Sequence, residues 1–365
     1  MFPFSSSPRH LVLVLCSVMT AAAAASASFR LATWNLRYDS MPNNITVQQS
    51  LAALPDPLQQ PAYFNLTGEQ PWSTRRIKVA QRLLSEGISL AGFQEGLVRQ
   101  VNDLAELLGD DWAWVGVGRD DGVAAGEFSP IFYKKNTPFV AGSKFPGAGS
   151  VRIATATHLR LRATGQAFTY INTHLDDQSD AQRQLGASLI LWRARYQASI
   201  DDTAPVLVTG DFNRCAFPSP FPQEPPKVPK EEKKNSSRRV HALQNSPATG
   251  TDSGAYRIIT GALAPVPINQ TFIDRFPIAN HTLPDFTTLD VRTQAPSHFA
   301  VSGNFGTYTG FTAPGDASQY THIDFIFGGS NGRWSIQAFK VETSLTDDGV
   351  IASDHRPVFG DITLS

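Results

Sequence analysis

Residues able to bind a metal ion or move a proton follow short apolar segments throughout this chain. Strand ends are the places where loops fix functional groups on a rigid scaffold. A further acid, Asp324, lies inside the apolar run 323–327, where a carboxylate needs a partner. The segments that end in such residues are Thr33-Trp-Asn35, Phe93-Gln-Glu95, Ile171-Asn-Thr-His174, Thr209-Gly-Asp211-Phe-Asn213 and Ser353-Asp354-His355.

These residue types suit the hydrolysis of a phosphate ester. Carboxylate and amide oxygens are the ligands that Mg²⁺ and Mn²⁺ prefer. A cation together with histidine and asparagine donors stabilises the charge that grows on phosphate oxygens during the reaction. A carboxylate beside the attacking water can remove its proton. The set therefore predicts a metal-dependent phosphoesterase.

Each residue alone has a simpler explanation. Asn35 could cap a loop, and Glu95 could be an N-terminal charge of the helix that follows it. A lone histidine at a strand end, such as His174 or His355, is commonly a hydrogen-bonded structural residue. Only Asp324 is hard to explain this way, because a charge inside an apolar strand is costly without a partner. The joint pattern favours function.

The elements that must position these residues can be read from periodicity. Many strands and a few amphipathic helices occur without a regular βαβ repeat, and the 41% apolar fraction with 23 Phe allows a large core. We expect an α/β fold in four layers, with two mixed β-sheets packed face to face and helices outside. Strands are expected at 29–34, 88–94, 112–117, 129–134, 155–162, 167–173, 205–209, 323–327, 334–341 and 357–362, helices at 75–84, 97–108 and 179–199, and a long loop at 36–71.

In their order along the chain, these motifs resemble those of the endonuclease/exonuclease/phosphatase superfamily, which includes pancreatic-type deoxyribonuclease. The resemblance runs from about Phe29 to the C-terminus and breaks at 214–244. A branch of mostly uncharacterised hydrolases, distantly similar to deadenylases, matches best. The segments that carry this closer likeness are 72–76, 114–133, 252–256 and Thr307-Tyr-Thr-Gly-Phe311.

The resemblance implies a role for each matching residue. The implied metal ligands for Mg²⁺ or Mn²⁺ are Asn35, Glu95 and Asp354. The implied catalytic residues are His174, Asp211, Asn213, Asp324 and His355, with Asp324 holding His355. His174 and Asn213 would also contact the substrate, as would Arg37 and Arg152.

One position departs from the pattern of the family. Arg37 occupies a place where some members carry an accessory acidic metal ligand, so a second metal is in question there and a phosphate contact is possible. The charged segment Arg119, Asp120, Asp121 and Glu127 is interpreted as a structural turn with ion pairs.

The N-terminus has the pattern of a signal peptide over residues 1–27, with an apolar stretch and the small-residue site Ala25-Ser-Ala27. The predicted domain spans 28–365. Only Cys215 then remains, which excludes an intramolecular disulfide. We expect a secreted, extracellular monomer without a transmembrane segment. Glycosylation sequons begin at Asn44, Asn65, Asn235, Asn269 and Asn280.

Residues 214–244 differ from the rest of the domain, because six prolines precede a charged run at 230–239. This composition predicts a disordered insertion. A retained intron translated in frame is an alternative interpretation. Transcripts lacking these codons would support it, and uniform transcript coverage would contradict it.

The substrate is left open between two classes. The first prediction is cleavage of phosphodiester bonds, of the nuclease or phosphodiesterase type. The alternative is a phosphomonoesterase for a sugar or inositol phosphate, favoured by the slight negative charge: without Arg9 the domain has 30 basic against 32 acidic residues, a net of −2. A non-catalytic binding module on the same scaffold is the second alternative.

Overall fold

The computed structural model describes residues 26–61, 68–135, 139–140, 152–213, 250–313 and 315–365. The predicted insertion 214–244 lies outside these residues, and so does the predicted signal peptide apart from its last two positions. Strand β1 begins at Ala27, at the predicted domain boundary. Within the described part of the chain, no helix is both long and apolar enough to cross a membrane.

Two mixed sheets of six strands each form the centre of the molecule. In the first sheet β1 runs parallel to β2 and the other pairs are antiparallel. Its strands, in spatial order, are β11 (Trp334–Val341), β12 (Val358–Leu364), β1 (Ala27–Asn35), β2 (Leu90–Gln94), β4 (Ile131–Lys134) and β3 (Trp112–Val115).

The second sheet is built in the same way around one parallel pair, β7 and β8. Its remaining pairs are antiparallel. The strands in spatial order are β5 (Phe139–Val140), β6 (Ala154–Arg160), β7 (Ala167–His174), β8 (Val206–Asp211), β10 (Asp324–Gly329) and β9 (Thr288–Asp290).

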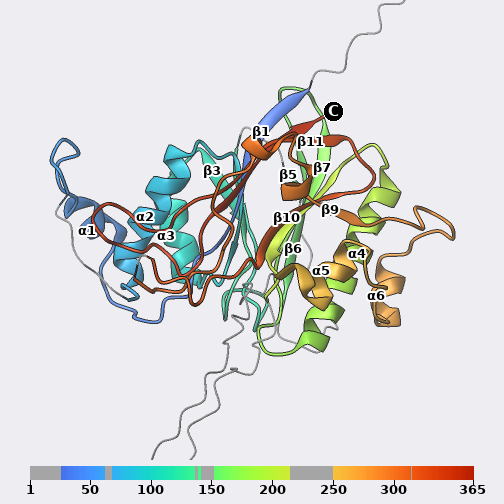
Figure 1. Cartoon of the computed structure of the whole chain (residues 1–365), viewed down its shortest axis with the longest axis horizontal. Helices are drawn as coiled ribbons and strands as arrows, with labels where there is room; N and C mark the ends of the chain where they lie inside the picture. Colours follow the sequence, from blue (N-terminus) through green and yellow to red (C-terminus); the bar gives the residue numbers. More distant parts are fainter. Residues whose placement is uncertain (1–25, 62–67, 136–138, 141–151, 214–249, 314) are drawn as a thin grey trace, which may run out of the picture.

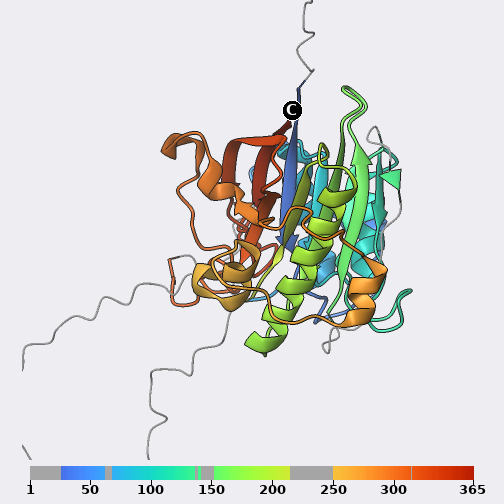
Figure 2. The ribbon, with the colours of Figure 1, turned by 90° about the vertical axis from the view of Figure 1, so that its right-hand side faces the viewer.

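Helices cover the outer face of each sheet and complete four layers (Figure 1). The first sheet carries α1 (Val47–Ala52), α2 (Trp72–Ser85) and α3 (Val98–Leu108). The second carries α4 (Asp180–Ile200), α5 (Gly254–Ile259) and α6 (Gln270–Arg275), and α4 lies along the sheet in the turned view (Figure 2). Short 3₁₀ turns occur at Gly250–Asp252, Val291–Gln294 and His298–Ala300.

Three apolar clusters hold these layers together. Leu31, Leu207 and Ile326 belong to the cluster between the sheets. Separate clusters join the first sheet to α2 and α3 and the second sheet to α4, α5 and α6. Burial of apolar side chains contributes about 1.5–3 kcal/mol for each large residue, so these interfaces are the main source of stability.

The predicted four-layer α/β sandwich is confirmed, and the helix and strand predictions agree with the structure to within a few residues. The predicted loop 36–71 is wrong in one part, because α1 interrupts it. Thr46 caps this helix: its side chain accepts from Gln49 N, and the Gln49 side chain accepts from Thr46 N. Such a capping box satisfies two otherwise free N–H groups and stabilises a short helix.

A buried arginine of α2 ties the loop that follows β1 to the loop that precedes β12. The side chain of Arg75 is fully buried and donates to five backbone carbonyls, which belong to Leu36, Arg37, Tyr38, Gln70 and Ala352. The first three follow Asn35, and the last precedes the segment 353–355. Arg75 therefore fixes the two loops that carry the first and last sequence motifs.

Replacing Arg75 is expected to destabilise the protein strongly. Arg75→Met should lower the free energy of unfolding by about 3 kcal/mol or more, because buried carbonyls lose their partners. The control is Arg82→Met in the same helix, since the Arg82 guanidinium forms no hydrogen bond with the residues that the structure describes. Chemical denaturation measures both, and equal stability of the two variants would contradict this role of Arg75.

Candidate active site

The strand registers bring the predicted site residues to one edge of the sandwich. In the first sheet Asn35 pairs with Gln94, so Glu95 follows directly beside it. In the second sheet His174 pairs with Asp211. Strand β10 runs the other way, and its first residue, Asp324, also pairs with Asp211. Two parallel pairs and one antiparallel strand thus place the residues together.

Hydrogen bonds of the buried Asn172 side chain connect the two sheets next to this edge, and we call this contact the polar seam. Asn172 of β7 donates to the carbonyls of Phe93 and Pro130 at 2.7 and 3.0 Å, and its oxygen accepts from Gln94 Nε2 at 2.7 Å. Gly92 leaves room for it, because a Cβ there would lie 2.4 Å from Asn172 Oδ1. The seam fixes the offset between the sheets and hence the distance between their strand ends. Sequence reasoning missed Asn172, which lies two positions before His174.

Asp211 is the centre of the site. Its Oδ2 atom accepts a hydrogen bond from Asn35 Nδ2 at 3.0 Å and lies 3.6 Å from His355 Nε2 and 3.7 Å from His174 Nε2. Its Oδ1 atom accepts from Asn213 N at 2.9 Å. Asp211 is buried. One carboxylate therefore contacts or faces four of the predicted site residues.

His355 is held as a cation between two acids. Its Nδ1 donates to Asp324 Oδ2 at 2.9 Å, and Asp324 is fully buried. Burial alone would lower the pKa of His355, but the charges of Asp324 and Asp211 outweigh it and raise the pKa to about 10. His355 is consequently protonated at neutral pH and can donate from Nε2.

His174 connects this centre to a second polar group. Its Nε2 lies 3.0 Å from Asn213 Nδ2, and its Nδ1 lies 3.0 Å from Arg152 Nη1. The Arg152 guanidinium and the Asn213 amide nitrogen can both only donate, and a neutral imidazole offers one acceptor nitrogen, so only one of these two contacts can be a hydrogen bond to the ring. Arg152 also pairs with Asp177.

Glu127 is a site residue that the sequence interpretation did not place here. Its Oε2 lies 3.7 Å from His174 Nδ1 and pairs with Arg119 at 2.7 Å and Arg152 at 3.4 Å. Burial would raise the pKa of Glu127, but His174 and the two arginines lower it. The interpretation of this segment as a turn with ion pairs is confirmed for Arg119, which pairs with Asp120 and Glu127. The structure adds that Glu127 also lies beside His174.

Glu95 and Asp354 form the acidic side of the site. Glu95 Oε1 accepts from Asn35 Nδ2 at 2.9 Å, and its Oε2 accepts from Tyr38 N at 3.1 Å. Burial raises the pKa of Asp354 to about 6; the charge of Glu95 adds to the rise, while His355 opposes it. A hard cation bound between two such carboxylates would reduce their electrostatic repulsion. These residues therefore fit Mg²⁺ or Mn²⁺.

A second group in the described part of the chain has the ligand types for a cation. Donor atoms of Asp211, Asp324 and His355 lie within 4.8 Å of one another. However, Nδ1 of His355 already bonds Asp324, and its Nε2 faces Asp211. These three residues are better described as an acid–imidazole unit. The assignment of the metal to Asn35, Glu95 and Asp354 stays a prediction, and Asn35 presents its amide nitrogen, not its oxygen, to Glu95.

Three site residues adopt left-handed backbone conformations. They are Arg37, Glu95 and Asn213, with φ of 56°, 58° and 51°. Residues other than glycine rarely adopt this conformation, and where they do it is commonly at functional sites. The Arg37 side chain lies 4.2 Å over the Tyr38 ring and pairs loosely with Glu69 at 3.4 Å, and its charge acts on Asp354 and Glu95.

The structure therefore gathers all ten predicted site residues. Side-chain contacts join eight of them. Arg37 joins through its backbone N–H, which donates to Asn35 Oδ1 at 2.9 Å, and Asp354 directly precedes His355 in the chain. The eight are Asn35, Glu95, Arg152, His174, Asp211, Asn213, Asp324 and His355.

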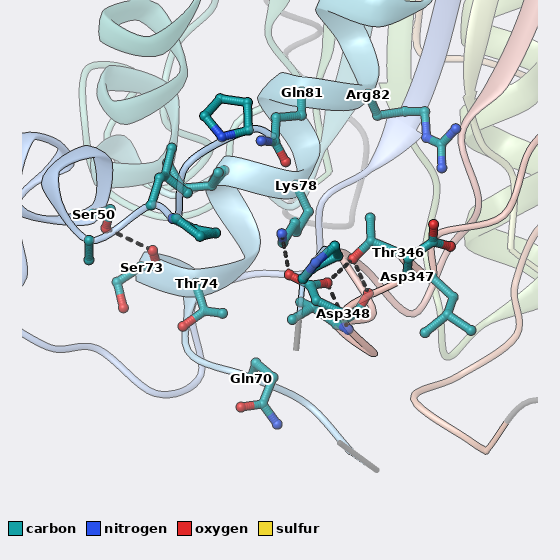
Figure 3. A pocket seen from close by; sticks show the side chains of 18 of the residues that line it. Ser50, Gln70, Ser73, Thr74, Lys78, Gln81, Arg82, Thr346, Asp347 and Asp348 are labelled. Carbon is teal, nitrogen blue, oxygen red and sulfur yellow. Dashed lines mark hydrogen bonds and ion pairs between the residues drawn. The ribbon is translucent and has the colours of Figure 1, made fainter. Parts of the chain in front are cut away.

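A large cavity of about 1360 Å³ lies elsewhere, between α2, the segment 45–61 that contains α1, and the loop 343–350. Figure 3 shows Lys78 of α2 reaching Asp348 across it. None of the ten site residues lines this cavity. The chemistry is therefore assigned to the strand-end cluster and not to this cavity.

Solved structures with this fold support the resemblance seen in the sequence. An endonuclease/exonuclease/phosphatase from Bacteroides vulgatus is 26% identical, with a TM-score of 0.61 over 93% of this chain and 100% of that one. A mannosyl-6-phosphatase from Bacteroides thetaiotaomicron is 19% identical, with a TM-score of 0.56 over 92% and 99%. The catalytic domain of human Nocturnin, with bound sulfate, is 14% identical, with a TM-score of 0.55 over 93% and 95%.

No protein-family model matches the sequence, and no curated protein matches it. The resemblance to the endonuclease/exonuclease/phosphatase superfamily is confirmed, and the chain has the deoxyribonuclease-I-like fold of that superfamily of phosphoesterases.

The charge of His355 should depend on Asp324. In the metal-free protein the imidazole is expected to stay protonated up to about pH 9, and Asp324→Asn should lower its pKa toward 6.5 because the nearest negative charge is lost. Since the folded pKa is raised, the stabilisation from this interaction is complete below pH 6.5 and is lost as the pH rises through 10.

Nitrogen-detected NMR titration of the His355 ring measures this difference. Asp361→Asn is the matched control, because Asp361 pairs with Arg30 on strand β1, away from the cluster. An unchanged His355 titration in Asp324→Asn would show that Asp324 does not hold the charge.

Proposed function

We propose that this protein is a secreted, divalent-metal-dependent phosphoesterase that uses Asp211 to activate water and His355 to stabilise the phosphate. The observation that carries the proposal is the placement of Asp211 Oδ2 within 3.7 Å of both His355 Nε2 and His174 Nε2. A carboxylate flanked by two histidines and an asparagine can accept a proton from water while its neighbours donate to phosphoryl oxygens.

In the proposed reaction, water attacks phosphorus and the bond to the leaving oxygen breaks. Asp211 takes the proton of the attacking water, and the leaving group takes a proton from solvent. His355 donates from Nε2 to a phosphoryl oxygen, and Asp324 keeps its ring charged and oriented. His174 and the amide of Asn213 donate to the same phosphate.

Glu95 and Asp354, with Asn35 beside them, would hold Mg²⁺ or Mn²⁺. The cation supplies a positive charge that binds phosphate oxygens and stabilises their growing negative charge. The support for this assignment is the mutual repulsion of Glu95 and Asp354, together with a donor set of hard oxygens. Arg37 and Arg152 are proposed to contact the substrate, and Arg37 occupies the position of a possible second-metal ligand.

Removing a carboxylate on the acidic side should weaken metal binding and hydrolysis together. We expect Glu95→Gln to bind Mn²⁺ about tenfold or more weakly in calorimetry and to lose most hydrolysis, as the wild type should with a chelator. Asp348→Asn, in the separate cavity, should match the wild type. Mn²⁺ binding unchanged in Glu95→Gln would move the metal site elsewhere, for example to Asp211, Asp324 and His355.

Two substrate classes are proposed, and an observation favours each. Cleavage of phosphodiesters fits the nuclease and phosphodiesterase type suggested by the sequence motifs. Hydrolysis of a phosphomonoester is favoured by the likeness to a mannosyl-6-phosphatase and by the net charge of −2, which does not attract nucleic acid. The complete acid–imidazole unit argues against a non-catalytic binding module.

A substrate panel should separate these classes. Residues 28–365 are assayed with Mg²⁺ or Mn²⁺ on DNA, RNA, aryl phosphodiesters and sugar phosphates, with Asp211→Asn and His355→Ala as inactive references. Because a monoester carries an additional negative charge, Arg37→Gln should raise KM for monoesters about tenfold more than for diesters. Activity that persists in both reference variants would show that the cluster is not the active site.

Secretion remains a proposal that the sequence pattern at 1–27 supports. Expression of the full chain in a eukaryotic host with a secretory pathway, followed by N-terminal sequencing of protein from the medium, tests it. A protein retained in the cell with an intact N-terminus would contradict it.

A further inference from the structure

The segment Thr307–Gly310 connects the backbone at Asp324 with the backbone at Asp354, the residue that precedes His355. Thr307 Oγ1 accepts from the backbone N–H of Ile323 and Asp324, both at 3.0 Å. The N–H groups of Thr309 and Gly310 donate to the carbonyl of Asp354 at 2.8 and 3.0 Å. The residue between these contacts, Tyr308, is bridged by its backbone to Thr321 on one side and His355 on the other.

This backbone arrangement directs the Tyr308 side chain over the site. Its ring meets the imidazole of His355 edge to face, with 5.0 Å between centroids and an angle of 68°. The negative charges of Asp354, Glu95 and Asp211 and the positive charge of Arg37 all act on its hydroxyl.

The hydroxyl has a weak partner that a ligand can replace. It donates to Oε1 of Gln319, an exposed side chain, at 3.3 Å. Burial raises the pKa of Tyr308, and the charges of Asp354, Glu95 and Asp211 add to this, so the group stays a neutral donor. A phenol kept protonated among carboxylates cannot serve as a nucleophile at neutral pH, but it can donate to an anionic oxygen.

We propose that Tyr308 is a catalytic residue whose hydroxyl leaves Gln319 and donates a hydrogen bond to a non-bridging oxygen of the bound phosphate. The inference rests on the proposed function, because it requires a phosphate ester between Asp211 and the acidic side. A neutral donor suits this place, since it adds a contact to the charged phosphate without competing with a cation for Glu95 and Asp354. The ring also covers His355 and limits its rotation.

The test compares Tyr308→Phe, which keeps the ring, with Tyr320→Phe on the same loop, where the hydroxyl accepts from Arg356 at 3.3 Å. With Mg²⁺ present, Tyr308→Phe is expected to lower kcat/KM about tenfold or more on the best substrate of the panel. It should weaken the binding of inorganic phosphate by a similar factor in calorimetry, with an unchanged melting temperature. Tyr320→Phe should match the wild type in all three measurements.

The outcomes separate the two proposals. Wild-type kinetics and phosphate affinity in Tyr308→Phe, alongside an active wild-type enzyme, would overturn the role of Tyr308 and leave the proposed function intact. A melting temperature lowered as much as in Tyr308→Leu would show that the hydroxyl only supports the fold. A wild-type protein that neither hydrolyses the panel nor binds phosphate would overturn both proposals.

Discussion

The site depends on one buried guanidinium. Arg75 contributes no atom to the catalytic cluster, yet it holds the carbonyls that follow Asn35 and the one that precedes Ser353. Ser353 Oγ in turn donates to the carbonyl of Asn35 at 2.6 Å. These bonds connect segments that are more than three hundred residues apart in the chain. A lysine could not satisfy five acceptors in fixed directions, whereas the planar fork of arginine can.

The two sheets contribute different chemistry to the cluster. The loops of the first sheet supply the acidic side, Glu95 and Asp354, while the second sheet supplies Asp211, His174 and Asp324. Asn35 spans the two, because its amide donates to Glu95 and to Asp211. The relative position of the proposed cation and the proposed base is therefore set by the packing of one sheet on the other. The seam at Asn172 fixes that packing through hydrogen bonds, which are more directional than apolar contacts.

Much of this arrangement could be predicted from the sequence, because its signals are local. Alternation and helical spacing located most elements, and polar residues at strand ends marked the cluster. Arg75, Asn172 and Glu127 could not be placed in this way. Their roles come from contacts between segments distant in sequence, and each looks ordinary in its own segment: an arginine in an amphipathic helix, an asparagine in a strand, an acid beside a turn. Thr46 and Gln49 have the spacing of a capping box, but the Pro, Asn and Gln residues around them favoured the prediction of a loop.

The left-handed backbone at Arg37, Glu95 and Asn213 has a consequence for the evolution of this chain. Each position would be relaxed by glycine, which adopts such a conformation without steric penalty. Selection for stability alone would thus favour removing the very side chains that form the cluster. With these side chains in place, this edge of the sandwich carries backbone strain of about 1 kcal/mol per residue, which glycine would relieve. Thermally robust descendants of this protein would consequently be at risk of losing their chemistry at these three positions first.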